Sequence, residues 1–302
     1  LTVAIEQAHE IIRQYPKAFM AWNILGMACK GLGKTDGATE AFKKVTELNP
    51  SYADGFSNLG VALEDEGKLE DATNAYRQAV TINPEHAQAY CNMGNVLGER
   101  GKLSAALEAY KNAVTIKPDY ALAFNNMGVT LKDQGQIDKA IEAYRNALSV
   151  QPDYPEAYNN IGLALKDQGK LEQALESYKK ALSVKPDYPD AYVNMGLALK
   201  DQRKPDEAIE AYEKAIANKP DYAEAYYNMG LIYQDQDMHE EAIEAYKQTL
   251  SIDPDYAQAY NNLGNVLEDQ GQLKEAIRAY KKALSIQPHY TEVHYNLGNA
   301  YE

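Results

Sequence analysis

The amino-acid sequence predicts an all-α solenoid built from repeated helical hairpins, and three observations support this fold class. A glycine recurs every 34 residues at nine places from Gly26 to Gly298, and a proline keeps the same period from Pro16 to Pro288. Within each period, apolar residues form two runs with helical spacing. A glycine separates the two runs and the proline follows the second, where helices end. A fixed period of this length indicates a stack of small repeats, none of which buries its apolar face alone.

Eight full repeats occupy residues 19–290, preceded by half a repeat in residues 1–18 and followed by the start of another in residues 291–302. We number the positions of each repeat 1 to 34, as in residues 257–290. Apolar positions 4, 7, 8 and 11 predict a first helix, and positions 20, 24, 27 and 28 predict a second. Because the pattern is continuous, we expect one elongated domain over residues 1–302.

The turn between the two helices carries a second signal. Position 15 is glycine in six of the eight repeats, as expected where a helix ends in a left-handed conformation. Arg203 and Asp237 replace this glycine in two neighbouring repeats. The two altered turns mark either a hinge or contact site, or sequence drift.

The first full repeat carries a family signature. Its residues, in order, are Trp22, Leu25, Gly26, Cys29, Ala38, Phe42 and Pro50. This pattern closely resembles the tetratricopeptide repeat (TPR), and the resemblance extends over the entire chain. It implies a right-handed superhelix, with first helices lining the concave side and second helices on the outside. It also implies a general protein-binding scaffold.

A row of asparagines marks the face of the first helices opposite the packing face. At about 100° per residue, positions 2, 6, 9 and 13 form this polar face, which the resemblance places on the concave wall. Position 6 holds the asparagine row: Asn58, Asn92, Asn126, Asn160, Asn194, Asn228, Asn262 and Asn296. Asparagine is a mediocre helix former that gains nothing from packing on an exposed face. Its amide, however, matches the backbone of an extended peptide, so we expect these residues to bind one. Inheritance during repeat duplication is the alternative.

Position 13 of the same face holds an acidic row. Its members are Asp65, Glu99, Asp133, Asp167, Asp201, Asp235 and Asp269. Acids near the C-terminus of a helix oppose its dipole, so helix stability does not account for the row. We expect it to recognise basic or hydroxyl-bearing side chains of a bound segment, a solvated polar face being the alternative. Lys132, Lys166 and Lys200, at position 12, would screen the middle of the row.

Position 5 lies at the edge of the polar face. Tyr227 and Tyr295 occupy it, and each is either a ligand contact or a packing residue, whereas Cys91 is expected to be a reachable thiol. The lysines and arginines with which some TPR proteins hold the C-terminal carboxylate of chaperones are missing at this position. The asparagine and acidic rows instead resemble those of the repeat domain of O-linked N-acetylglucosamine transferase. The array is also similar to those of bacterial TPR-glycosyltransferase and TPR-sulfotransferase proteins.

Composition excludes several function classes. With 44 acidic and 30 basic residues, a net charge of −14 gives no electrostatic reason to bind nucleic acid or an anionic membrane. The sequence contains no run of 18 apolar residues, so it predicts no membrane span. Two cysteines without metal-ligand spacing suit a reducing compartment, and because no signal or transmembrane segment is in view we expect a cytoplasmic location. No catalytic residues, metal site, cofactor site or phosphate-binding loop can be assembled from the sequence.

We therefore interpret the chain as a non-catalytic scaffold that binds a protein or an extended, neutral-to-basic peptide. One alternative is the substrate-recognition domain of a larger glycosyltransferase- or sulfotransferase-type enzyme. The other is a self-assembling module. At the two ends, Ala4, Ala8 and Ile11, and Leu297, Ala300 and Tyr301, predict apolar surfaces that would support end-to-end association.

Overall fold

The computed structural model describes residues 1–301, which form eighteen α-helices. The chain divides into two compact units, Leu1–Pro152 and Asp153–Glu302. The helices of the first unit are α1 (Thr2–Gln14), α2 (Phe19–Gly31), α3 (Thr35–Leu48), α4 (Ala53–Asp65), α5 (Leu69–Ile82), α6 (Ala87–Glu99), α7 (Leu103–Ile116), α8 (Ala121–Asp133) and α9 (Ile137–Val150). The described part of the second unit contains α10 (Pro155–Asp167), α11 (Leu171–Val184), α12 (Pro189–Asp201), α13 (Pro205–Asn218), α14 (Ala223–Asp235), α15 (His239–Ile252), α16 (Ala257–Asp269), α17 (Leu273–Ile286) and α18 (Thr291–Asn299).

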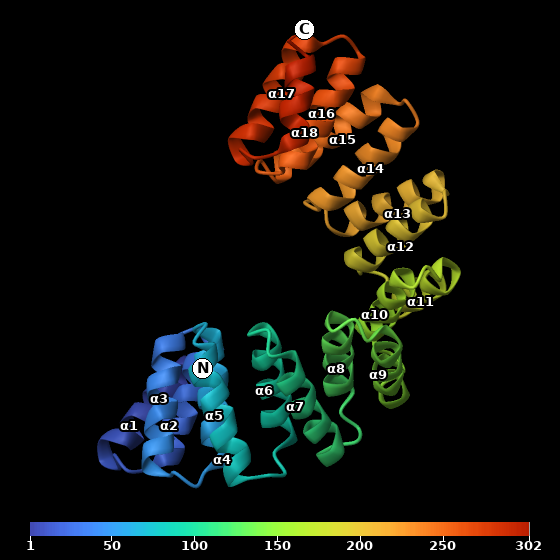
Figure 1. Cartoon of the computed structure of the whole chain (residues 1–302). Helices are drawn as coiled ribbons and strands as arrows, with labels where there is room; N and C mark the ends of the chain where they lie inside the picture. Colours follow the sequence, from blue (N-terminus) through green and yellow to red (C-terminus); the bar gives the residue numbers. More distant parts are fainter. Residues whose placement is uncertain (302) are drawn as a thin grey trace. The chain divides into compact units, whose positions relative to one another are not determined.

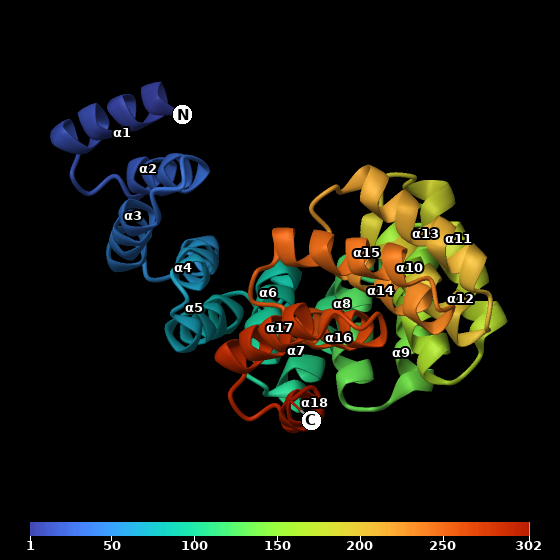
Figure 2. The same ribbon diagram turned by 90° about the horizontal axis from the view of Figure 1, so that it is seen from above.

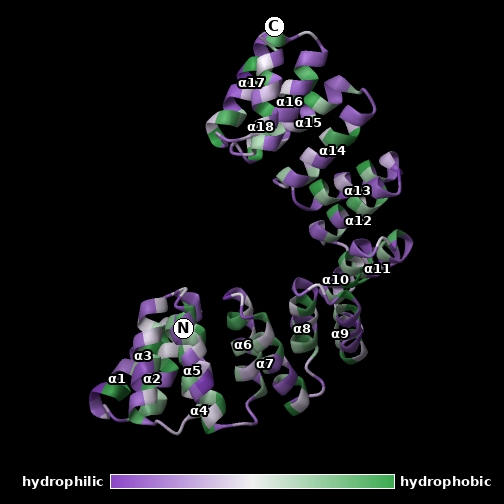
Figure 3. Cartoon of the chain, in the orientation of Figure 1, coloured by the Kyte–Doolittle hydropathy of each residue, from purple (hydrophilic) through white to green (hydrophobic). Residues whose placement is uncertain are grey.

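Each full repeat is a helical hairpin, as the apolar pattern predicts. A first helix of 13 residues packs against a second helix of 14 residues, as α4 and α5 do. Within each compact unit, the second helix of one hairpin also packs against the first helix of the next, so hairpins follow one another in chain order (Figures 1 and 2). Both units are therefore all-α solenoids. Every helix carries apolar and polar residues together (Figure 3), as expected for an amphipathic element that buries one face.

In each full repeat, position 8 requires glycine because an aromatic ring lies against the helix backbone there. A Cβ atom built on Gly60 would lie 2.6 Å from Cε1 of Tyr76, at position 24 of the same repeat. The Tyr76 ring is fully buried, so it has no room to move away. The same contact holds the other hairpins together: Gly26 with Phe42, Gly94 with Tyr110, Gly128 with Tyr144, Gly162 with Tyr178, Gly196 with Tyr212, Gly230 with Tyr246 and Gly264 with Tyr280.

The turn prediction is confirmed, including its two exceptions. The six glycines at position 15 have φ between 69° and 74°. Arg203 and Asp237 adopt the same left-handed conformation, at φ 60° and 58°. In the Arg203 turn, the backbone N–H of Lys204 donates to the carbonyl of Leu199 at 3.0 Å, the bond that closes the glycine turns as well. The geometry of the turn is therefore unchanged, which favours sequence drift over a hinge.

The residues expected to form apolar surfaces at the chain ends differ in exposure. Ala8 and Ala300 are buried, whereas Ile11 and Tyr301 are exposed. Across residues 1–301, none of the helices combines the length and the apolar character needed to cross a bilayer.

Candidate functional site

The asparagine row lies deeper in the structure than its sequence pattern predicts. Asn228 is buried, and the other seven asparagines are half-buried. The expectation that these side chains gain nothing from packing is therefore wrong, because their amides make specific contacts within the array.

Several of these amides link one repeat to the previous one. Nδ2 of Asn58 donates to Oδ1 of Asn23 at 3.1 Å, and Nδ2 of Asn194 donates to Oδ1 of Asn159 at 2.9 Å. In both cases the acceptor is at position 5 of the preceding repeat. Such a bond contributes about 0.5–1.5 kcal/mol to stability, so the row has a structural role.

A second set of acceptors lies at position 9. Oδ1 of Asn95 accepts from Nδ2 of Asn126, in the next repeat, at 2.9 Å and from the Tyr110 hydroxyl, in its own repeat, at 2.8 Å. Asn265 accepts in the same way from Asn296 at 3.0 Å and from Tyr280 at 2.8 Å. An asparagine at position 9 therefore joins the core tyrosine of one hairpin to the asparagine row of the next.

Two members of the row depart from this pattern. Nδ2 of Asn228 donates to the carbonyl of Glu224 in its own helix at 2.9 Å. Oδ1 of Asn92 accepts from Nε2 of Gln88, also in its own helix, at 2.8 Å. Because the partner differs from repeat to repeat, the groups left over for a ligand also differ along the row.

The acidic row lies on the surface, as predicted. All seven side chains at position 13 are exposed. Nζ of Lys30 lies 3.7 Å from a carboxylate oxygen of Asp65, and Nζ of Lys166 lies at the same distance from Asp201. A lysine at position 12 thus screens the acid of the next repeat. Exposed ion pairs of this kind contribute at most about 1 kcal/mol.

Position 12 also covers the core tyrosine of its own repeat, a role that sequence reasoning missed. Glu64 accepts from the Tyr76 hydroxyl at 2.8 Å, Gln234 from Tyr246 at 2.7 Å and Glu268 from Tyr280 at 2.7 Å. Burial raises the pKa of Glu64, and the carboxylates of Glu99 and Asp65 raise it further. Position 12 varies among lysine, glutamate, glycine and glutamine, and this variation was the only sign in the sequence that its role differs between repeats.

Position 5 faces the interior rather than a groove edge. Cys91 is fully buried, so the expectation of a reachable thiol is wrong, and burial raises the pKa of that thiol. The ring of Tyr227 is half-buried and stands nearly perpendicular to that of Tyr256, with centroids 4.8 Å apart. Its hydroxyl accepts from Nδ2 of Asn262 at 3.2 Å, so Tyr227 packs between repeats. Tyr295 differs, because 70% of its surface is exposed.

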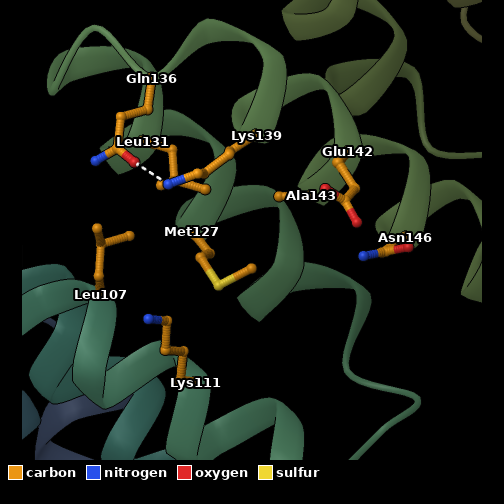
Figure 4. A pocket seen from close by; sticks show the side chains of 9 residues that line it. All are labelled: Leu107, Lys111, Met127, Leu131, Gln136, Lys139, Glu142, Ala143 and Asn146. Carbon is orange, nitrogen blue, oxygen red and sulfur yellow. Dashed lines mark hydrogen bonds between the residues drawn. The ribbon is translucent and has the colours of Figure 1, made fainter.

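The asparagine and acidic rows meet in a cavity of about 310 Å³ between α6 and α8. Asn95, Glu99, Asn126 and Asp133 all contribute to its lining. Another cavity of the same size lies among α7, α8 and α9 (Figure 4). Its lining includes Lys111, Met127 and Lys139 but no member of either row. The cavity between α6 and α8 is therefore the better candidate site.

Comparisons with known proteins agree with this architecture. Family models of the tetratricopeptide repeat match residues 21–52, 187–255 and 221–289, and a TPR repeat model matches residues 63–101, 94–135, 130–169 and 162–203. A search of curated proteins found no match.

Solved structures similar to this chain are TPR proteins. The crystal structure of MamA shares 35% identity and a TM-score of 0.50, over 54% of this chain and 95% of MamA. YrrB, described as a TPR protein with an unusual peptide-binding site, shares 26% identity and a TM-score of 0.50, over 62% of this chain and 97% of YrrB. The Cut9–Hcn1 hetero-tetramer of the APC/C, at 19% identity, shares the fold with a TM-score of 0.63, over 98% of this chain and 59% of that chain.

Repeats of this kind typically form scaffolds for protein–protein interaction and are generally non-catalytic. The signature residues, the hairpin stack and these matches together show that the chain belongs to the tetratricopeptide repeat family.

Proposed function

We propose that this chain is a non-catalytic scaffold that binds an extended, neutral-to-basic protein segment along the polar face of its first helices. The observation that carries the proposal is the acidic row, which offers one exposed carboxylate in each of seven repeats. Within each compact unit, one carboxylate per repeat suits a ligand that is itself extended and repeats its backbone groups.

Electrostatics support a basic or neutral ligand. The net charge of −14 attracts cations, and in each compact unit the acidic row adds exposed carboxylates on the polar face of the first helices. Carboxylates at the ends of first helices oppose the helix dipole, so a bound cation relieves an unfavourable interaction. The ion pairs of Asp65 and Asp201 with lysines, at 3.7 Å, are weak, so a ligand cation can compete with them.

The asparagine row supports backbone recognition even though it also joins repeats. An amide group has two N–H donors and a carbonyl oxygen with two lone pairs. The bond from Asn194 to Asn159 uses one of these donors and fixes the orientation of the amide. A polar group held in one orientation binds a ligand at lower entropic cost, so packing and binding are compatible roles.

The test is selection of twelve-residue peptides from a display library by three forms of the chain. The first is unchanged, and the second carries Asp201→Asn, Asp235→Asn and Asp269→Asn. The third is a matched control with Glu176→Gln, Glu210→Gln and Glu213→Gln, exposed acids on second helices. Both variants lose three negative charges, so a difference between them reports position rather than net charge.

The unchanged chain and the control should enrich peptides rich in lysine, arginine, serine or threonine, and the acidic-row variant, which keeps four of the seven acids, should enrich them less strongly. Failure of the unchanged chain to enrich any peptide would contradict the proposal. Equal losses in the two variants would also contradict it, because binding would then depend on net charge alone.

A further inference from the structure

The cavity between α6 and α8 exists because one repeat lacks a side chain that others have. At position 12, Glu64, Gln234 and Glu268 cover the hydroxyl of the core tyrosine in their own repeats. In α6 this position is Gly98, and a Cβ atom placed there would have no atom within 4 Å beyond its chain neighbours and the nearby backbone of its own helix. The space filled by a side chain in those three repeats is therefore open beside Tyr110, and Gly98 lines the cavity.

The same glycine also leaves the next acid without the lysine that four other repeats carry at position 12. Lys30 and Lys166 are at position 12, and each lies near the acid at position 13 of the following repeat. Asp133 is at position 13 of the repeat that follows Gly98, so no position-12 lysine stands before it. In the repeats that carry Lys30 and Lys166, an ammonium group lies beside the acid of the next repeat, and Asp133 has no such group from position 12.

The lining of the cavity fits a long basic side chain. Glu99 and Asp133 contribute exposed carboxylates from two successive first helices. Asn95 and Asn126, joined to each other and to the Tyr110 hydroxyl, supply a polar and pre-oriented surface. Val129 also lines the cavity and is 39% exposed, which offers an apolar contact for methylene groups. Lysine and arginine combine an apolar stem with a charged head in this way.

We propose that this cavity is a specificity pocket that accepts one lysine or arginine side chain of the bound segment, between Glu99 and Asp133. The inference rests on the proposed function, because it assumes that an extended segment binds the polar face. It adds that recognition is uneven along the array and that Gly98 sets the position of a required basic residue.

The test uses the same twelve-residue peptide library with variants at one position. Gly98→Gln should fill the space, because Gln234 accepts from the Tyr246 hydroxyl in the equivalent place. Gly98→Lys should supply the missing cation within the chain. Gly98→Ala is the matched control, since it changes the same residue but leaves the cavity open. Because nothing lies within 4 Å of the added Cβ atom, we expect all three variants to fold.

The unchanged chain and Gly98→Ala should select peptides with a basic residue at one fixed position, and Gly98→Gln and Gly98→Lys should lose that preference. In a synthetic peptide from the selection, norleucine in place of this residue should weaken binding to the unchanged chain by about tenfold, equivalent to about 1.4 kcal/mol. The same replacement should not affect binding to Gly98→Gln. Asp133→Asn, which leaves the helix backbone as it is, should weaken the preference in the same direction.

Two failures are distinguishable. If the unchanged chain selects no peptides, the proposed function is wrong, and the assignment of the pocket is wrong as well. If it selects peptides but Gly98→Gln and Asp133→Asn keep the basic preference, peptide binding stands and the pocket assignment is overturned.

Discussion

Nδ2 of Asn126 donates to Oδ1 of Asn95, one repeat earlier, at 2.9 Å, and the Tyr110 hydroxyl donates to the same oxygen at 2.8 Å. One acceptor therefore connects the core of one hairpin to the polar face of the next. Repeat arrays depend on such nearest-neighbour contacts for their stability. A surface built this way cannot lose its amides without some loss of stability, which affects how its binding role must be tested.

Replacing Asn126 or Asn194 by alanine should lower the free energy of unfolding by about 0.5–1.5 kcal/mol, because each change removes a half-buried bond between repeats. Urea denaturation followed by circular dichroism measures this. Asp235→Ala, on the same face but exposed, is the control and should change stability by less than about 0.5 kcal/mol. Equal, negligible effects of all three changes would show that these bonds contribute nothing.

Gly162→Ala should destabilise its repeat by about 1–3 kcal/mol through overpacking. The added Cβ atom would lie 2.4 Å from Cε1 of Tyr178, whose ring is fully buried. Gly98→Ala is the comparison, because it places the same methyl group in open space within a helix. It should be neutral or stabilising by up to about 1 kcal/mol. The melting temperature of Gly162→Ala should therefore be clearly lower than that of Gly98→Ala. Similar melting temperatures would show that the Tyr178 ring does not require glycine at position 162.

Arg203→Gly should stabilise the chain by about 0.5–1 kcal/mol. Relief of the strained left-handed conformation at φ 60° outweighs the extra chain entropy that glycine brings to the unfolded state. Gly135→Ala, at the equivalent position with φ 74°, should have the opposite sign. Thermal unfolding of both variants gives the answer, and a destabilising Arg203→Gly would mean that the arginine side chain makes a compensating contact.

The fold could be predicted from the sequence because its signals repeat. Gly60, Gly67 and Pro84 each recur at the same period, so a weak local indication becomes strong when it appears many times. The candidate site could be predicted only in part. Periodicity predicted that position 6 lies opposite the packing face of its own helix, but it could not show that Asn58 bonds to a residue of the previous repeat. That contact depends on how closely successive hairpins approach.

Position 5 illustrates the same limit. A helical projection puts it at the edge of the polar face, yet Cys91 is fully buried, in a cluster that includes Ala106 of α7 and Ala123 of α8. Gly98 is the reverse case. In the sequence it is one of 19 glycines. Only the structure shows that Glu64, at the equivalent position, covers the Tyr76 hydroxyl and that Gly98 instead lines a cavity.

Glu64→Gln should stabilise the chain at neutral pH. Burial raises the pKa of Glu64 above its ordinary value of 4.5, so the folded state binds a proton more readily than the unfolded state. A group of this kind favours folding at low pH, and its contribution is lost as pH rises through the folded-state pKa. Glutamine keeps the acceptor for the Tyr76 hydroxyl without the charge, as Gln234 does for Tyr246.

The stability difference between the variant and the unchanged chain, measured by urea denaturation, should therefore be positive at pH 7 and shrink as pH falls toward 4. Glu85→Gln, at an exposed position, should show no such trend. A difference that stays constant with pH would mean that Glu64 is as well solvated in the folded chain as in the unfolded one.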